Sequence, residues 1–169
     1  MKTTIRLYSL SYSDIRTYFF ALVFIAGNII LPQLIHLIPN GGQTFLPVYF
    51  FTLIAAYKYG MKVGLLTAIL SPLVNHFLFG MPAATVLPII LIKSSLLAVF
   101  TAWTANHSLR LSFLALIFSV LSYQLVGTGI EWIIEGSLYV ALQDFRIGIP
   151  GMLLQIFGGY ALLKAIAKI

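Results

Sequence analysis

Residues 84–105 read ATVLPIILIKSSLLAVFTAWTA, an apolar run with a single charged side chain, Lys93. About 20 predominantly apolar residues in helical form span the hydrocarbon core of a bilayer. The run therefore predicts a transmembrane helix. Lys93 lies about nine residues from the start of this helix, roughly 13 Å along its axis, so its ammonium group is expected at hydrocarbon depth.

The composition of the whole chain agrees with a membrane protein. Hydrophobic residues make up 60% of the 169 residues and charged residues only 8%, whereas soluble domains carry about 25% charged residues. This small number of charges cannot cover a water-soluble globule of this size. Lipid must therefore act as the solvent for much of the surface. We predict an all-α membrane protein that forms a single domain over residues 1–169.

Five further apolar runs follow the same pattern, separated by turns and polar breaks. We predict a compact bundle of six transmembrane helices, over 16–38, 45–57, 63–79, 84–105, 111–132 and 147–166. Pro47 suits the first turn of the second helix. The mixed segment 135–146 is predicted to lie at the membrane interface as an irregular or short amphipathic stretch.

The distribution of charges predicts the orientation of this bundle. When the six helices alternate in direction, one side receives most of the cations: Lys2, Arg6, Arg16, Lys58, Lys62, Arg110, Lys164 and Lys168. The other side receives Arg146 together with Glu131, Glu135 and Asp144, while Asp14 joins the cations. Cytoplasmic loops are rich in Lys and Arg. Both termini are therefore predicted to be cytoplasmic.

Several classes of function lack the residues that they need. There is no cysteine, and His36, His76 and His107 show no paired-ligand spacing, so we expect no metal site and no cofactor. The four acids form no paired-carboxylate motif and no phosphate-binding glycine loop occurs, so we expect no enzyme and no ATP hydrolysis by this chain. The net charge of +6 fits cytoplasmic loops better than nucleic acid.

Lys93 is the residue with the most information about function. A charge inside a span usually faces a cavity, a partner or a ligand. One interpretation is a contact for an anionic or carboxylate-bearing solute. The other is a structural ion pair with Glu131 or Glu135, or an ammonium that reaches the membrane surface along its flexible stem.

Other polar residues are predicted to share the outer half of the bundle with Lys93. Together they would line an outward-facing pocket, and they are Gln33, His36, Asn75, His76, Gln124, Glu131 and Trp132. Taken singly, polar residues of this kind more often occupy a hydrogen-bonded core or interface position.

Small residues recur every fourth position in three of the predicted helices. The sets are Gly60, Gly64 and Ala68, then Ser94, Ala98 and Ala102, and finally Ala161 and Ala165. Such spacing lets helices approach closely in lipid. It predicts packing inside the bundle, with docking of another membrane subunit as the alternative.

The stretch 40–103 resembles the substrate-binding S component of energy-coupling-factor (ECF) vitamin transporters. The motifs that carry the resemblance are Phe45-Leu46-Pro47, Tyr59-Gly60 followed by Gly64, Leu70-Ser71-Pro72-Leu73, and Gly80-Met81-Pro82. The resemblance implies six helices and a pocket near the outer face that captures a vitamin or related micronutrient. It also implies a bacterial or archaeal cell (inner) membrane, a transmembrane coupling protein and two cytoplasmic ATPases.

The same resemblance implies a docking patch of small residues on the first helix. The family often carries Ala-x-x-x-Ala there, whereas this chain has Ala21 and Ala26 five apart, with Gly27 adjacent. A structural membrane scaffold, such as an MreD-like cell-shape factor, has similar length and helix count and is the alternative. A scaffold, however, has little use for Lys93 within a span.

Overall fold

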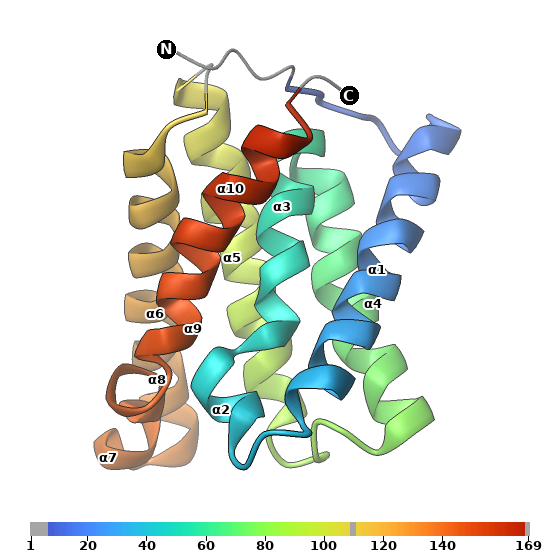
Figure 1. Cartoon of the computed structure of the whole chain (residues 1–169). Helices are drawn as coiled ribbons and strands as arrows, with labels where there is room; N and C mark the ends of the chain where they lie inside the picture. Colours follow the sequence, from blue (N-terminus) through green and yellow to red (C-terminus); the bar gives the residue numbers. More distant parts are fainter. Residues whose placement is uncertain (1–6, 109–110, 168–169) are drawn as a thin grey trace.

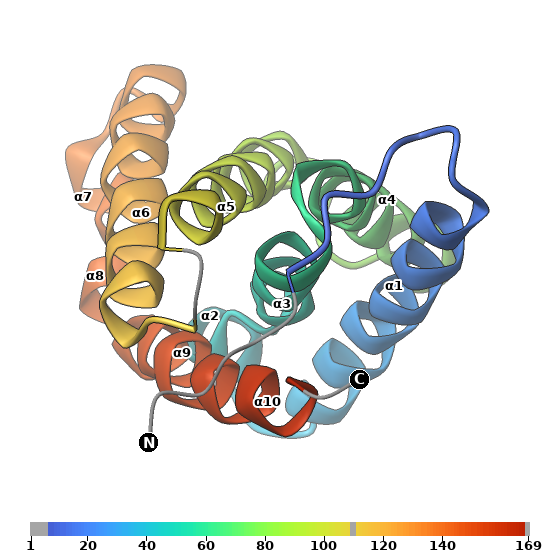
Figure 2. The same cartoon turned by 90° about the horizontal axis from the view of Figure 1, so that it is seen from above.

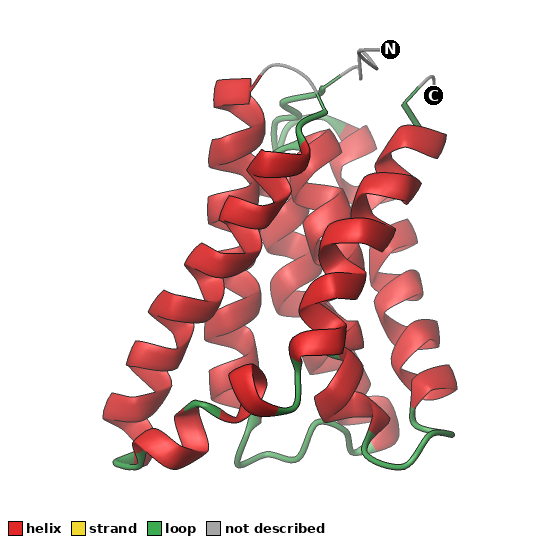
Figure 3. Cartoon of the chain, turned by 60° about the vertical axis from the view of Figure 1, so that its left-hand side comes forward, coloured by secondary structure: helices red, strands yellow, loops and turns green. Residues whose placement is uncertain are grey.

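The computed structural model describes residues 7–108 and 111–167, and all of its regular secondary structure in those residues is helical (Figure 3). Lys2, Arg6, Arg110 and Lys168, four of the predicted cytoplasmic cations, lie outside the described residues. The elements are α1 (Ile15–Ile35), α2 (Gly41–Phe45), the 3₁₀ turn η1 (Pro47–Tyr49), α3 (Phe50–Tyr59), α4 (Met61–Phe79), α5 (Leu87–Ser108), α6 (Phe113–Glu135), α7 (Leu138–Ala141), α8 (Gln143–Arg146), α9 (Ile149–Leu153), the π-helical turn η2 (Leu154–Gly158) and α10 (Gly159–Ala165).

Four of these helices, α1, α4, α5 and α6, are long and apolar enough to cross a membrane. A shorter apolar helix runs through α9, η2 and α10, over Ile149–Ala165. Large apolar side chains are exposed along the outside, including Phe77, Ile133 and Phe157. In its described residues the chain is thus all-helical, with the apolar helices of a multi-pass membrane protein.

Helix α3, which has only ten residues, occupies the centre of the bundle. Figure 2 shows it enclosed by the others, and it packs against α1, α4, α5 and α10. Leu53, Ile54 and Ala55 are 0% exposed, and Tyr57 is 1% exposed. Because most of α3 is covered by the other helices, its ten residues need not match the thickness of the hydrocarbon layer.

The predicted second helix, 45–57, is not continuous, which corrects the sequence-based boundary. Leu46 has a φ of 48°, in the left-handed region, and separates α2 from η1. Pro47 follows it, and the residue before a proline is disfavoured in the right-handed helical region because the ring clashes with it. The chain therefore bends at Leu46, between α2 and η1, and η1 is followed directly by α3.

The remaining boundaries differ less. The first helix ends at Ile35 rather than at 38, the fourth begins at Leu87 rather than at 84, and the fifth extends to Glu135 rather than to 132. The segment 135–146, predicted as an irregular or short amphipathic stretch, contains the two short helices α7 and α8. Gly136, with a φ of 68°, ends α6 and turns the chain into them.

Two of the three predicted sets of small residues, those on α4 and α5, pack in the interior of the bundle. Ala56, Ala68, Ala98 and Ala102 form one buried cluster between α3, α4 and α5. A Cβ atom on Gly64 would lie 2.6 Å from the Cβ of Ala56, so glycine is what allows α3 and α4 to come this close. Ala161 and Ala165 are exposed and take no part in this packing.

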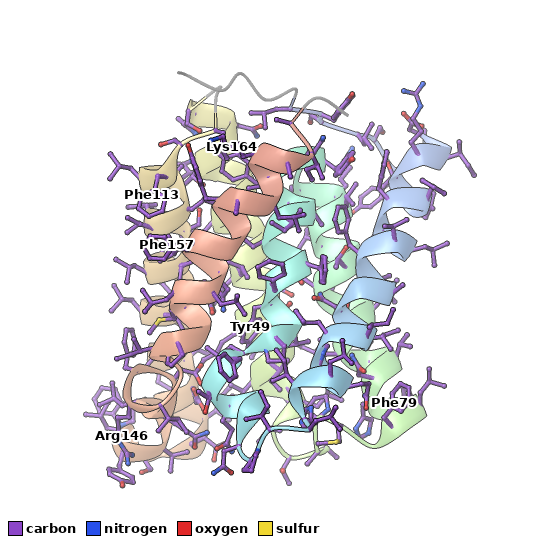
Figure 4. The ribbon with its side chains drawn as sticks, in the orientation of Figure 1. Tyr49, Phe79, Phe113, Arg146, Phe157 and Lys164 are labelled. Atoms are coloured by element: carbon purple, nitrogen blue, oxygen red, sulfur yellow. The ribbon has the colours of Figure 1, made fainter. Side chains whose placement is uncertain are left out.

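Both ends of the described chain meet at one end of the bundle. The backbone N–H of Tyr8 donates to the carbonyl of Lys58 at 2.8 Å, and the ammonium of Lys58 donates to the carbonyl of Ile166. Lys164 lies at this end, whereas Arg146 and Phe79 lie at the opposite one (Figure 4). The chain therefore traverses the bundle an even number of times.

Candidate functional site

A cavity of about 400 Å³ is lined by residues near the end of the bundle remote from the chain ends. The short helices α2, α7 and α8 lie at this end, at the bottom of Figure 1. The wall of the cavity comes from the last turns of α1, the α2–η1 bend, the loop after α4, the first turns of α5, the last turns of α6, and α7–α8. The bend at Leu46 matters here, because residues on both sides of it line the cavity. Pockets of this volume suit small organic molecules.

Lys93 is at the centre of one wall and is held by two carboxylates. Its Nζ lies 2.6 Å from Glu131 Oε2 and 2.7 Å from Asp144 Oδ2. Lys93 is 2% exposed, and its side-chain partners are 15% and 13% exposed. The ammonium donates a charge-assisted hydrogen bond to Asp144 and forms an ion pair with Glu131. The cluster joins α5, α6 and α8, and 51 residues of chain separate Lys93 from Asp144.

A glycine on α6 makes room for this lysine. A Cβ atom on Gly127 would lie 2.7 Å from Lys93 Cγ, closer than real Cβ atoms come to other atoms. Gly127 sits one helical turn from Glu131, so it lets the stem of Lys93 lie flat on α6 while the ammonium reaches the carboxylate.

A buried hydrogen-bond network around Asn28 ties α1 to α3 and α4. The Asn28 amide nitrogen donates to Thr52 Oγ1 at 3.1 Å and to Ser71 Oγ at 3.3 Å. Its amide oxygen accepts from the backbone N–H of Phe51 at 3.1 Å. That N–H belongs to the first turn of α3, where helices lack internal acceptors. Asn28 therefore fixes the position of α3 directly behind the bend.

Asn75 connects this network to the cavity. Its amide nitrogen donates to the backbone carbonyl of Asn28 at 2.9 Å. Its amide oxygen is buried and has no hydrogen-bond partner among the described residues, while Asn75 itself lines the cavity. An unsatisfied buried acceptor is costly, so this oxygen is suited to bind a donor that enters the cavity.

The structure brings five of the predicted pocket residues together around the cavity: Gln33, His36, Asn75, Lys93 and Glu131. The other three lie elsewhere. His76 Nδ1 bonds to the carbonyl of Pro82 at 2.7 Å, Gln124 is fully buried behind the wall, and Trp132 is 50% exposed on the outside. The positions of these residues along their helices did not reveal which of them would reach the cavity.

Sequence reasoning missed Asp144 and Tyr49. The ion-pair alternative for Lys93 is correct for Glu131, but the second partner is Asp144 and not Glu135, which lines the cavity without pairing with Lys93. Asp144 lies in the mixed segment 135–146, for which the sequence predicted no definite structure. The structure forms the short helices α7 and α8 there. Tyr49, 3% exposed, sits in η1 beside the cavity, with its ring 5.5 Å from that of Tyr123.

The three predicted docking residues on α1 do not share one face. Ala21 is 2% exposed, inside the bundle. A Cβ atom on Gly27 would lie 2.8 Å from the ring of Phe51, so Gly27 also faces inward. Ala26 alone of the three is exposed.

Comparisons with protein-family models, curated proteins and solved structures find no match to this chain. Within residues 7–108 and 111–167, no group of three or more His, Cys, Asp or Glu side chains is arranged to hold a metal ion.

Proposed function

We propose that this protein is the substrate-binding membrane subunit (S component) of an ECF-type ABC importer and captures a vitamin or related micronutrient from outside the cell. The observation that carries the proposal is the cavity of about 400 Å³. It combines an apolar lining from residues such as Val86 and Ile89 with a few buried polar groups, which is the usual make-up of a small-molecule site. The resemblance in stretch 40–103 supports the same function.

The proposed topology has six spans, with α2, η1 and α3 together as the second and α9, η2 and α10 together as the sixth. The described cations Arg16, Lys58, Lys62 and Lys164 lie at the end where the chain ends meet, and Glu131, Glu135 and Asp144 lie at the cavity end. By the positive-inside rule, both termini are then cytoplasmic and the cavity opens outward. A broken second span agrees with transporters, in which discontinuous helices form the substrate site.

The proposed partners are a transmembrane coupling protein and cytoplasmic ATPase subunits in a bacterial or archaeal cell (inner) membrane. The chain offers no phosphate-binding loop, so the energy for uptake must come from such partners. The protein itself is proposed to bind and not to catalyse.

The proposal is tested by ligand binding to the purified protein. Native mass spectrometry of gently extracted protein should reveal a copurified small molecule, and members of a vitamin panel should raise the thermal unfolding temperature. Ligands that bind only the folded protein stabilise it by mass action.

Two matched variants locate the site. Val86 lines the cavity and is 45% exposed, while Val126 lies outside it and is 43% exposed. Val86→Trp should abolish the ligand-induced shift because the indole fills the cavity, whereas Val126→Trp should keep it. A protein that carries no ligand and responds to no vitamin would instead favour the scaffold alternative, an MreD-like cell-shape factor.

A further inference from the structure

The acids and bases that line the cavity do not balance. Three carboxylates face it, from Glu131, Glu135 and Asp144, and one ammonium, from Lys93. With His36 neutral, the lining carries two net negative charges. The sequence singled out Lys93 as a contact for an anion, but the structure surrounds this lysine with more negative charge than it carries.

The charge of Lys93 is already paired with carboxylates of the protein. Both of its partners lie within 2.7 Å of its Nζ, and each pair is largely shielded from water. An anionic ligand would have to displace one of these carboxylates or approach both of them closely. Like charges at such separations repel strongly in a low-dielectric site. The cluster therefore disfavours an anion as the ligand.

Two further groups present acceptors without partners. The amide oxygen of Asn75, in a residue only 2% exposed, has no hydrogen-bond donor among the described residues. His36 Nδ1 lies 2.7 Å from the carbonyl oxygen of Pro32. A carbonyl only accepts, so Nδ1 carries the hydrogen and Nε2 of the neutral ring is left as an acceptor. The cavity is thus rich in acceptors as well as negative.

We propose that the cavity binds a small organic cation that carries N–H donors, such as a protonated amine or amidinium attached to an apolar ring. The inference rests on the proposed binding function and specifies its substrate class. The cationic group would lie beside Asp144 and Glu131, with an N–H donating to Asn75 Oδ1. The ring would lie against the apolar side chains of Val86, Ile89 and Ile90, which line the same cavity.

In this arrangement Lys93 positions the site and does not bind the ligand's charge. It holds Glu131 and Asp144 together, which would otherwise repel each other. Its own ammonium neutralises only one of the two, so one carboxylate charge remains for the ligand. This division of roles predicts opposite effects for substitutions on the two sides of the ion pair.

The first experiment compares ligands that share a ring and differ in charge. Pyridoxamine, pyridoxine and 4-pyridoxate are tested by thermal shift and calorimetry, together with thiamine as a second cation and biotin as a second anion. Any copurified molecule is identified by native mass spectrometry. We expect the bound or copurified molecules to be cations. Binding of anions only would overturn this inference and leave the proposed function standing, while no binding and no copurified molecule would overturn both.

The second experiment measures the affinity of charge variants of the cluster for the cation that binds in the first experiment. Variants of the acids and of Lys93 should affect this affinity differently. Asp144→Asn should weaken binding by about tenfold or more, the scale of one charge-assisted hydrogen bond, and Glu135→Gln, at the exposed rim, should weaken it less. Lys93→Gln keeps an N–H donor and makes the lining more negative, so cation affinity should hold or rise. Weaker binding in Lys93→Gln with tighter binding in Asp144→Asn would overturn the inference. If Lys93→Gln does not fold, the ranking of the two acid variants decides: equal or absent effects overturn it.

Discussion

Gly127→Ala tests whether the packing of α6 against Lys93 holds the charged cluster in place. The added Cβ would lie 2.7 Å from Lys93 Cγ, 3.3 Å from Cε and 3.5 Å from Cδ. Ordinary van der Waals contact begins at 3.4 Å, so Cγ must move by about 0.7 Å, the difference between the two values. Because Cγ lies close to the backbone, it can move only if the whole side chain rotates.

That rotation would disturb both ion pairs, which are only 2.6 and 2.7 Å long. Overpacking of this kind costs about 1–3 kcal/mol. Against it stands the gain of alanine over glycine within a helix, about 0.5–1 kcal/mol. We therefore expect Gly127→Ala to be neutral or destabilising, although the same substitution at an open site should stabilise.

The chain provides that open site two residues away. Gly129 lies on the same helix, and a Cβ atom there would have no other heavy atom within 4 Å. The helix-propensity gain is common to both variants, so the difference between them isolates the contact with Lys93. It should amount to about 1–3 kcal/mol, or about 2–4 °C in unfolding temperature per kcal/mol for a chain of this length.

The assay is thermal unfolding of both variants in the same detergent, followed by intrinsic fluorescence, without added ligand. Gly129→Ala should unfold at a higher temperature than the parent protein, and Gly127→Ala at a lower temperature than Gly129→Ala. Equal shifts for the two variants would refute the argument, because they would mean that the stem of Lys93 is free to yield.

Three more predictions follow from other parts of the structure. Asn28→Ala should lower the stability of the bundle by about 1–3 kcal/mol in chemical or thermal unfolding, because it leaves the part-buried N–H of Phe51 and the buried hydroxyls of Thr52 and Ser71 without their partner; Asn106→Ala, at an exposed position, is the control and should change little. Gly64→Ala should also destabilise, by about 1–3 kcal/mol relative to Gly129→Ala, because its Cβ would lie 2.6 Å from the Cβ of Ala56 and 2.9 Å from its Cα, atoms that cannot rotate away. The chain has no cysteine, so single cysteines report topology directly: a membrane-impermeant maleimide should label Ala84→Cys in intact cells and Ser13→Cys only after the membrane is opened, and the reverse result would invert the proposed orientation.

The membrane class of this protein was determined by its sequence alone. Long apolar runs with almost no charge have only one stable environment, and the four longest helices lie where those runs predict them, within a few residues. Pro47 marked the position where the second run is broken, although the sequence analysis placed it in the first turn of a continuous helix. The steric effect of a proline on the preceding residue is local, so that break was in principle readable.

The composition of the cavity was decided by the tertiary structure. Which of Asn75 and His76 faces inward depends on the rotation of α4 against its neighbours, which apolar periodicity does not define when a helix is hydrophobic all round. The partners of Lys93 depend on how α7 and α8 fold back, which brings Asp144 to within 2.7 Å across 51 residues of chain. The sequence revealed a charge in the membrane, but only the packing of α5, α6 and α8 showed that two carboxylates already hold it.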